Sequence, residues 1–161
     1  MWDMRSSLLE LKLHLFDVVL GQNVLVCNNK VDYGVIARDE DGFVLGGGGG
    51  LNEIPISMEE AKCYTFEESI KLACRLNIKS DVIFETDNAC LVNKLKSHHT
   101  YIMINDTRIK ECKKAFVNFK LADLVWTNCS CNMVTDFVRK CVRRLDLDFL
   151  TWTIPRISMM L

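Results

Sequence analysis

One carboxylate in this chain stands where an α/β domain gathers its ligands. Residues 82–86 (VIFET) are β-branched and aromatic and predict a short strand, and Asp87 follows directly before a predicted helix over 88–96. Because ligands bind at the carboxyl ends of the strands in such domains, Asp87 is well placed to hold a metal ion. Its alternative role is to cap the helix that follows, and the two roles are compatible.

The predicted elements change type along the chain. Region 11–20 begins with alternating apolar residues and predicts a strand, with a helix over 5–20 as the competing interpretation. Ser57 and Glu60 form a capping box that opens a helix ending near Leu76. The other expected elements are strands over 33–38, 43–46 and 121–126, helices over 107–119 and 132–144, and turns at 28–30 and 39–42. This order predicts an α/β fold with a mixed sheet.

Composition excludes several classes of protein. With 161 residues, 49% of them hydrophobic, the chain is expected to form one domain with a buried core rather than a disordered segment. The formal net charge is −1, so bulk charge favours neither nucleic acid nor a membrane surface. Charged residues interrupt every apolar stretch before transmembrane length, and the N-terminus lacks a signal-peptide pattern. We expect a soluble, monomeric intracellular protein, nuclear or cytoplasmic, with no membrane partner.

Three features of the sequence are interpreted without assigning them a site. The eight cysteines are scattered and include no CxxC pair, which indicates free thiols in a reducing compartment and disfavours a zinc site. Glycines 46–50 lack the lysine and helix start of a phosphate-binding loop, and we interpret them as a flexible loop or frayed strand end. His98 and His99 are interpreted as surface residues of a loop.

Four motifs follow one another in a specific order. They are Gly34-Val35-Ile36-Ala37-Arg38-Asp39 with Gly42, Ile70-Lys71-Leu72-Ala73, Glu85-Thr86-Asp87, and Asn132-Met133-Val134-Thr135-Asp136. In this order and spacing they resemble the ribonuclease H-like superfamily, and most closely the reverse-transcriptase-like ribonuclease H domain common in plant genomes. The resemblance covers residues 11–143. It implies a ribonuclease H-like fold: a five-stranded mixed sheet, three antiparallel hairpin strands and then parallel strands, flanked by helices.

The resemblance also sets the expected domain limits and chemistry. We expect an N-terminal extension over 1–10, the domain over 11–144 and a C-terminal tail over 145–161. Enzymes of this family hold two divalent ions, Mg²⁺ or Mn²⁺, between carboxylates and cleave the RNA strand of an RNA–DNA hybrid. The implied metal ligands are Asp17, Asp87 and Asp136, and Glu60 is the glutamate nearest to the fourth catalytic position. For Asp136, a favourable position near a helix N-terminus is the alternative.

Three departures from the family pattern bear on catalysis. The family's catalytic glutamate falls on Lys62, whose ammonium group would pair with the aspartates and weaken divalent binding. Trp126 and Cys129 stand where the family has a histidine and an arginine. The segment leading to Asp17 is one residue longer than the family's and lacks the following glycine, so a bulge would have to absorb the difference. Asp32 is the alternative, but it leaves little room for a hairpin.

Local clusters of basic residues offer a surface for nucleic acid. Lys110, Lys113 and Lys114 share one predicted helix, and Arg139, Lys140, Arg143 and Arg144 form a stripe on the last one. A solvated face is the alternative to a surface that tracks phosphates, and only the latter gives strongly salt-dependent binding. Two main functions stay open: a weakened metal-dependent endonuclease acting on RNA–DNA hybrids, and a catalytically inactive domain that binds nucleic acid or protein. A small α/β domain that binds a phosphorylated ligand is the third.

Overall fold

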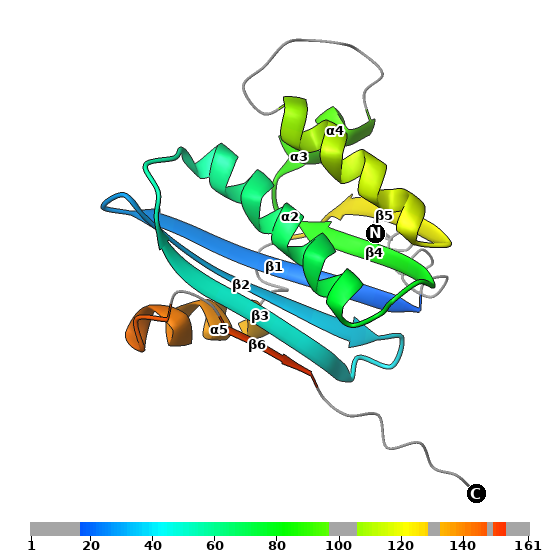
Figure 1. Ribbon diagram of the computed structural model, residues 1–161, viewed down its shortest axis with the longest axis horizontal. Coiled ribbons are helices and arrows are strands. Elements are labelled where there is room, and N and C mark those ends of the chain that lie inside the picture. The colour runs from blue at the N-terminus through cyan, green and yellow to red at the C-terminus, as the bar shows by residue number, and fades with distance from the viewer. Residues whose placement is uncertain (1–16, 97–105, 129–132, 148–149, 154–161) are drawn as a thin grey trace, which may run out of the picture.

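The computed structural model describes residues 17–96, 106–128, 133–147 and 150–153, which build one sheet with helices on both faces (Figure 1). Its strands are β1 (Val18–Cys27), β2 (Lys30–Asp39), β3 (Val44–Glu53), β4 (Asp81–Thr86), β5 (Leu121–Trp126) and β6 (Leu150–Thr153). Its helices are α2 (Met58–Arg75), α3 (Ala89–Lys96), α4 (Asp106–Ala115) and α5 (Met133–Arg144), with a 3₁₀ turn η1 (Phe116–Asn118). The strand order is β5-β4-β1-β2-β3-β6. Strands β4 and β5 run parallel to β1, and the other neighbours pair antiparallel, as expected for a mixed sheet.

The hairpin between β1 and β2 closes with two asparagines. Asn28 and Asn29 have φ values of 51° and 59°, the left-handed region that both central residues of a type I′ turn require. The predicted turn is therefore confirmed. A two-residue loop leaves no freedom of register, and Asn23 of β1 stands opposite Gly34 of β2.

The first strand lies later in the chain than expected. Its described residues begin at Val18, so the strand predicted over 11–20 is wrong in position, and residues 11–16 lie outside the described residues. Gly21, Gln22 and Asn23 interrupt the apolar pattern and resemble a loop in the sequence. They lie inside β1 because each pairs with a residue of β2 in the hairpin, which satisfies backbone groups that a loop would leave to water.

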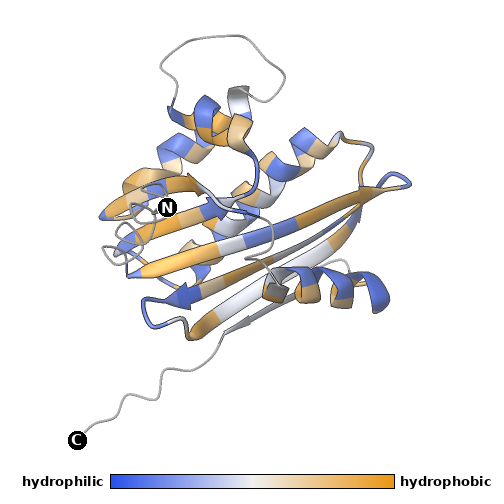
Figure 2. Cartoon of the chain, turned by 180° about the vertical axis from the view of Figure 1, so that it is seen from behind, coloured by the Kyte–Doolittle hydropathy of each residue, from blue (hydrophilic) through white to orange (hydrophobic). Residues whose placement is uncertain are grey.

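The main core fills the space between the sheet and the layer of α2, α3 and α4. Figures 1 and 2 show these three helices on one face, while α5 crosses the opposite face over β1, β2 and β3. Phe66 of α2 packs edge-on against Phe84 of β4, with ring centroids 5.5 Å apart. Both side chains are fully buried, so this contact anchors α2 above the strands that carry the candidate site.

The glycine run is a regular part of the sheet. Glycines 46–50 lie inside β3 and are buried, so their interpretation as a loop or frayed end is wrong. Close packing explains the composition: a Cβ on Gly47 would overlap the Trp152 ring, and one on Gly49 would lie 3.2 Å from a Val138 methyl group. The sequence alone does not show what covers a strand, and a run of glycines without that cover suggests flexibility.

The end of the chain contributes a sixth strand. β6 pairs antiparallel with β3, with Trp152 opposite Gly47, within the segment expected to be a tail. The fold thus agrees with the expected architecture and has one strand more. The helix expected over 107–119 ends at Ala115 and continues as η1. None of the described helices is long and apolar enough to cross a membrane.

Candidate functional site at the strand ends

Asp87 lies one residue beyond β4, at the carboxyl end predicted for a ligand-binding carboxylate. The ammonium nitrogen of Lys62 is 3.4 Å from its Oδ1, and their side chains are 25% and 42% exposed. The indole N–H of Trp126 donates to the backbone carbonyl of Asp87 at 3.2 Å, which holds the loop against β5. Asn88, not Asp87, caps α3, since its Oδ1 accepts hydrogen bonds from the N–H groups of Cys90 and Leu91. The carboxylate of Asp87 is therefore left to face Lys62.

Asn23 lies on β1, the neighbour of β4 in the sheet. β1 and β4 are paired in parallel from Val18–Val82 to Leu20–Phe84, and the same register brings Asn23 level with Asp87. The Asn23 side chain points to the α5 face, where its Oδ1 accepts a hydrogen bond of 2.8 Å from Arg139 Nε. The first strand thus presents a neutral amide, and not a carboxylate, at the end of β4.

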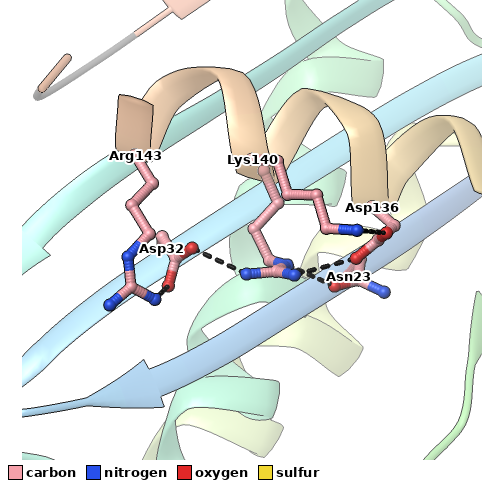
Figure 3. A network of polar contacts seen from close by, with 6 residues as sticks. Asn23, Asp32, Asp136, Lys140 and Arg143 are labelled. Carbon is pink, nitrogen blue, oxygen red and sulfur yellow. Dashed lines mark hydrogen bonds and ion pairs between the residues drawn. The ribbon is translucent and has the colours of Figure 1, made fainter. Parts of the chain in front are cut away.

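Arg139 ties three elements together through Asn23, Asp32 and Asp136, which are labelled in Figure 3. Its guanidinium donates to Asn23 of β1, to Asp32 of β2 and to Asp136 one turn earlier on α5, each bond being 2.8 Å long. Asp32 is only 1% exposed and has Arg143 as a second cation at 3.8 Å. A planar guanidinium with five fixed donors suits such a three-way contact, which a lysine could not reproduce.

Asp136 is held by two cations. Besides Arg139, Lys140 approaches its other carboxylate oxygen at 2.8 Å from the next turn of α5 (Figure 3). The hydrogen bond from Lys140, followed by that from Arg139, lowers the pKa of the Asp136 carboxyl below its usual value. We call the eight residues described so far the strand-end cluster: Asn23, Asp32, Lys62, Asp87, Asp136, Arg139, Lys140 and Arg143.

Asp17, the expected first-strand ligand, is at the other end of the sheet. Its N–H donates to the carbonyl of Asp81, the first residue of β4, at 3.0 Å. Asp87 follows the last residue of that strand, so the two aspartates are separated by roughly 20 Å at 3.3 Å per residue. The structure therefore does not bring Asp17 together with Asp87 and Asp136. The physical reason is the later start of β1.

Glu60 is engaged in the capping box. The Ser57 N–H donates to its carboxylate at 3.0 Å, and the Glu60 N–H donates to the Ser57 hydroxyl at 3.2 Å. The prediction of this box is confirmed. Lys62, two residues further along α2, is the side chain that reaches Asp87. Cys129, Cys131, His98 and His99 lie outside the described residues.

The predicted basic residues divide between the two faces of the sheet. Lys110, Lys113 and Lys114 belong to α4, and Lys114 pairs with Glu111 at 3.1 Å. Arg139 and Arg143 belong to α5 on the opposite face, and Arg139 is buried with its donors committed to the cluster. Arg143, 42% exposed, is the more accessible of the two arginines.

Sequence reasoning missed Asn23 and misjudged Asp32. Both follow from the hairpin: with Asn28 and Asn29 as the two loop residues, the residue opposite Gly34 is fixed as Asn23. The turn signal was in the sequence, and counting from it places Asn23 at the first-strand position. Asp32 needs no room for a hairpin because it lies within β2 and faces α5.

The strand-end cluster does not fit a pair of divalent cations. Such a centre needs several carboxylates with free oxygens, and this one has Asp87 and Asp136 at the surface, each paired with a cation. Asn23 contributes a neutral amide and Lys62 an ammonium group. Among the described residues, no three histidine, cysteine, aspartate or glutamate side chains are grouped to hold an ion.

Comparison with known proteins identifies the family of this chain. The model of the reverse transcriptase-like family matches residues 23–141, a range that begins at Asn23 and includes every residue of the cluster except Arg143. No curated protein matches this chain in sequence.

Solved structures share the fold at low sequence identity. A ribonuclease H1 from Halobacterium salinarum NRC-1 superimposes with a TM-score of 0.66 at 12% identity, over 79% of this chain and 97% of that one. An N-terminal ribonuclease H domain from Mycobacterium tuberculosis gives 0.69 at 13% identity, over 80% and 94%. LC11 ribonuclease H1, solved with an RNA/DNA hybrid, gives 0.69 at 10% identity, over 80% and 98%. The chain therefore belongs to the reverse transcriptase-like family and has the ribonuclease H-like fold.

Proposed function

We propose that this chain is a nucleic-acid-binding domain of the ribonuclease H type, with an RNA–DNA hybrid as its ligand and with the metal-dependent hydrolysis of its family strongly weakened. The observation that carries the proposal is the ion pair between Lys62 and Asp87, 3.4 Å apart at the carboxyl end of β4. It stands at the point where the family would hold a metal.

Family membership and fold support the choice of ligand. The matched residues 23–141 include β2, β3, β4, β5 and three of the described helices whole, with the second half of β1 and α5 as far as Cys141. LC11 ribonuclease H1, a structure of the same fold, was solved with an RNA/DNA hybrid bound. A protein recognises such a duplex by its A-like shape, its phosphates and its 2′-hydroxyl groups, which require a positively charged surface more than base-specific contacts.

The charges in the cluster support the loss of hydrolysis. A divalent ion at Asp87 would lie close to the Lys62 ammonium, and one at Asp136 would compete with Arg139 and Lys140 for the same oxygens. Opposed charge and occupied ligands both reduce the affinity for metal. The neutral Asn23 removes a further source of negative charge.

A second function, slow hydrolysis, is favoured by one observation. The Lys62–Asp87 pair is half-exposed and 3.4 Å long, and ion pairs of this kind contribute only about 0–1 kcal/mol. Displacing Lys62 from Asp87 therefore costs little free energy, and a metal ion at high concentration can compete for this carboxylate. Cleavage that appears only at high Mg²⁺ or Mn²⁺ is the expected sign of this second function.

Cleavage of a labelled RNA–DNA hybrid tests the proposal. The native protein, Lys62→Glu, Asn23→Asp and the double variant are compared in Mg²⁺ and Mn²⁺. Lys79→Glu is the control, because it makes the same charge change in the loop before β4, at the far end of the sheet. We expect little cleavage by the native chain and a gain of about tenfold or more for the double variant, equivalent to about 1.4 kcal/mol of barrier.

Efficient cleavage by the native protein, with no gain in the double variant, would contradict weakened hydrolysis. Binding is measured in parallel by anisotropy of the same hybrid. Failure of the native protein to bind the hybrid under any condition would contradict the ligand assignment.

A further inference from the structure

The strand-end cluster carries a positive charge without any metal. It contains four cationic side chains (Lys62, Arg139, Lys140 and Arg143) and three anionic ones (Asp32, Asp87 and Asp136), a formal net charge of +1 at neutral pH. A centre built from several carboxylates is negative until cations enter it, and only then attracts a phosphate. This cluster attracts a phosphate as it stands.

The cluster is arranged with its charges in layers. Asp32, 1% exposed, and the buried Arg139 form the lower layer, where they neutralise each other. Lys140 is 66% exposed and lies above them on α5. Lys62, 25% exposed, projects from α2, on the face of the sheet opposite to α5 (Figure 1), and reaches Asp87 just beyond β4. Lys140 and Arg143 are therefore the most exposed cations of the cluster, and Lys62 is partly exposed beside Asp87 at the end of β4.

Each of these lysines has donors to spare. An ammonium group donates three hydrogen bonds, and in this structure Lys62 directs it to Asp87 and Lys140 directs it to Asp136. The carboxylates orient the lysines at the strand ends. Because both pairs are solvent-accessible, exchanging a carboxylate contact for a phosphate contact requires little free energy.

We propose that Lys62 and Lys140 bind backbone phosphates of the nucleic acid directly, in place of metal ions, with Asp87 and Asp136 as their exchangeable partners. The inference rests on the proposed function and deepens it: hybrid binding by this chain is independent of divalent metal. Arg139 acts as a positioning residue, since its contacts with Asn23, Asp32 and Asp136 hold α5 and therefore Lys140 in place.

Two substitutions with opposite expected effects test the site. Lys62→Gln removes a cationic hydrogen-bond donor to the phosphate. It is expected to weaken hybrid binding several-fold and to reduce the slope of log K against log salt by about 1. Asp87→Asn releases Lys62 from its partner and removes a negative charge, so it is expected to tighten binding. A purely structural ion pair predicts that both substitutions act in the same direction.

The measurement is fluorescence anisotropy of a labelled RNA–DNA hybrid, in EDTA and in Mg²⁺ at equal ionic strength. Native binding is expected to agree within about twofold between the two buffers, since the phosphate contacts are those of lysines. Lys79→Gln is the matched control and is expected to bind like the native protein. Thermal unfolding verifies that each variant folds, and Lys140→Gln, an exposed position, takes the place of Lys62→Gln should that variant fail to fold.

Three results would overturn the inference. They are native binding that appears only with Mg²⁺, weaker binding by both Lys62→Gln and Asp87→Asn, and an equal loss in Lys79→Gln. The first two leave hybrid binding itself intact and therefore leave the proposed function standing. No binding by the native protein in either buffer would overturn both.

Discussion

At the scale of single residues, the site is defined by which carboxylates are neutralised. Asp136 accepts from both Lys140 and Arg139, and these bonds lower its pKa, with the Lys140 bond as the larger cause. A carboxyl whose pKa is lower in the folded than in the unfolded protein adds stability above its unfolded value, here 3.8, and loses that contribution as the pH falls through the folded pKa.

We therefore expect Asp136→Asn to lower Tm at pH 7, with the difference from the native protein shrinking as the pH falls below about 3.8. The measurement is thermal unfolding across the pH range. Asp41→Asn, in the exposed turn before β3, is the control and should show no such difference. A constant difference at every pH would mean that the ion pairs of Asp136 do not contribute to stability.

Glu85 gives the opposite prediction. Burial raises the pKa of its carboxyl, and Arg38, 3.5 Å away, offsets this only in part. Since a raised pKa favours the folded state below the unfolded value, ionisation of Glu85 costs stability as the pH rises above about 4.5. Glu85→Gln should thus raise Tm at pH 7 and converge with the native protein in acid. Glu53→Gln on the exposed end of β3 is the control, and a lower Tm for Glu85→Gln at pH 7 would show that the Arg38 contact outweighs burial.

At the scale of elements, the close approach of α5 to β2 positions half of the strand-end cluster. A Cβ added to Gly34 would lie 2.5 Å from the Thr135 carbonyl oxygen and 3.0 Å from the Arg139 nitrogen, both in the backbone of α5. Gly34 therefore sets the distance at which Arg139 reaches Asn23 and Asp32. The helix cannot move without lengthening these bonds.

Gly34→Ala should consequently destabilise the fold by about 1–3 kcal/mol, the usual cost of overpacking, and also weaken hybrid binding. Gly42→Ala is the comparison, because its Cβ has open space and its cost comes from the φ of 84° alone. Chemical denaturation and anisotropy measure the two effects. Unchanged hybrid binding by a folded Gly34→Ala variant would mean that the position of α5 does not matter for the ligand.

The elements also show how far the sequence could be interpreted. The capping box at Ser57, the asparagine turn and the strand ending at Asp87 depend on neighbours within a few residues, and all three were predicted. The packing of the β3 glycines depends on Trp152 and α5, which lie far along the chain. Local patterns do not encode these contacts. Asn23 was missed for a different reason: the asparagine turn fixes its register, but the first strand had been placed too early for that register to be counted.

At the scale of the whole molecule, the site unites segments from β1, β2, α2, β4 and α5. Their charges pair within the site: the Lys62 ammonium group faces Asp87, and the Arg139 guanidinium group bonds both Asp32 and Asp136. Such a set stabilises the fold without an ion. We therefore expect that a metal site here would require changing more than one residue.

Metal-linked stability follows from this arrangement. A native state that binds Mg²⁺ gains about 2.7 kcal/mol when the free ion is at 100 times its dissociation constant, and a state that does not bind gains nothing. We expect the native protein to show the same Tm in MgCl₂ as in NaCl of equal ionic strength.

The double variant Asn23→Asp with Lys62→Glu adds two carboxylates beside Asp87 and should gain Tm in MgCl₂. Asn23→Asp with Lys79→Glu has the same net charge but only one carboxylate at the site, so it should gain less. Equal gains in the two double variants would show that total charge, and not the geometry at the strand ends, governs the response. A gain in the native protein would place a metal in the cluster despite Lys62.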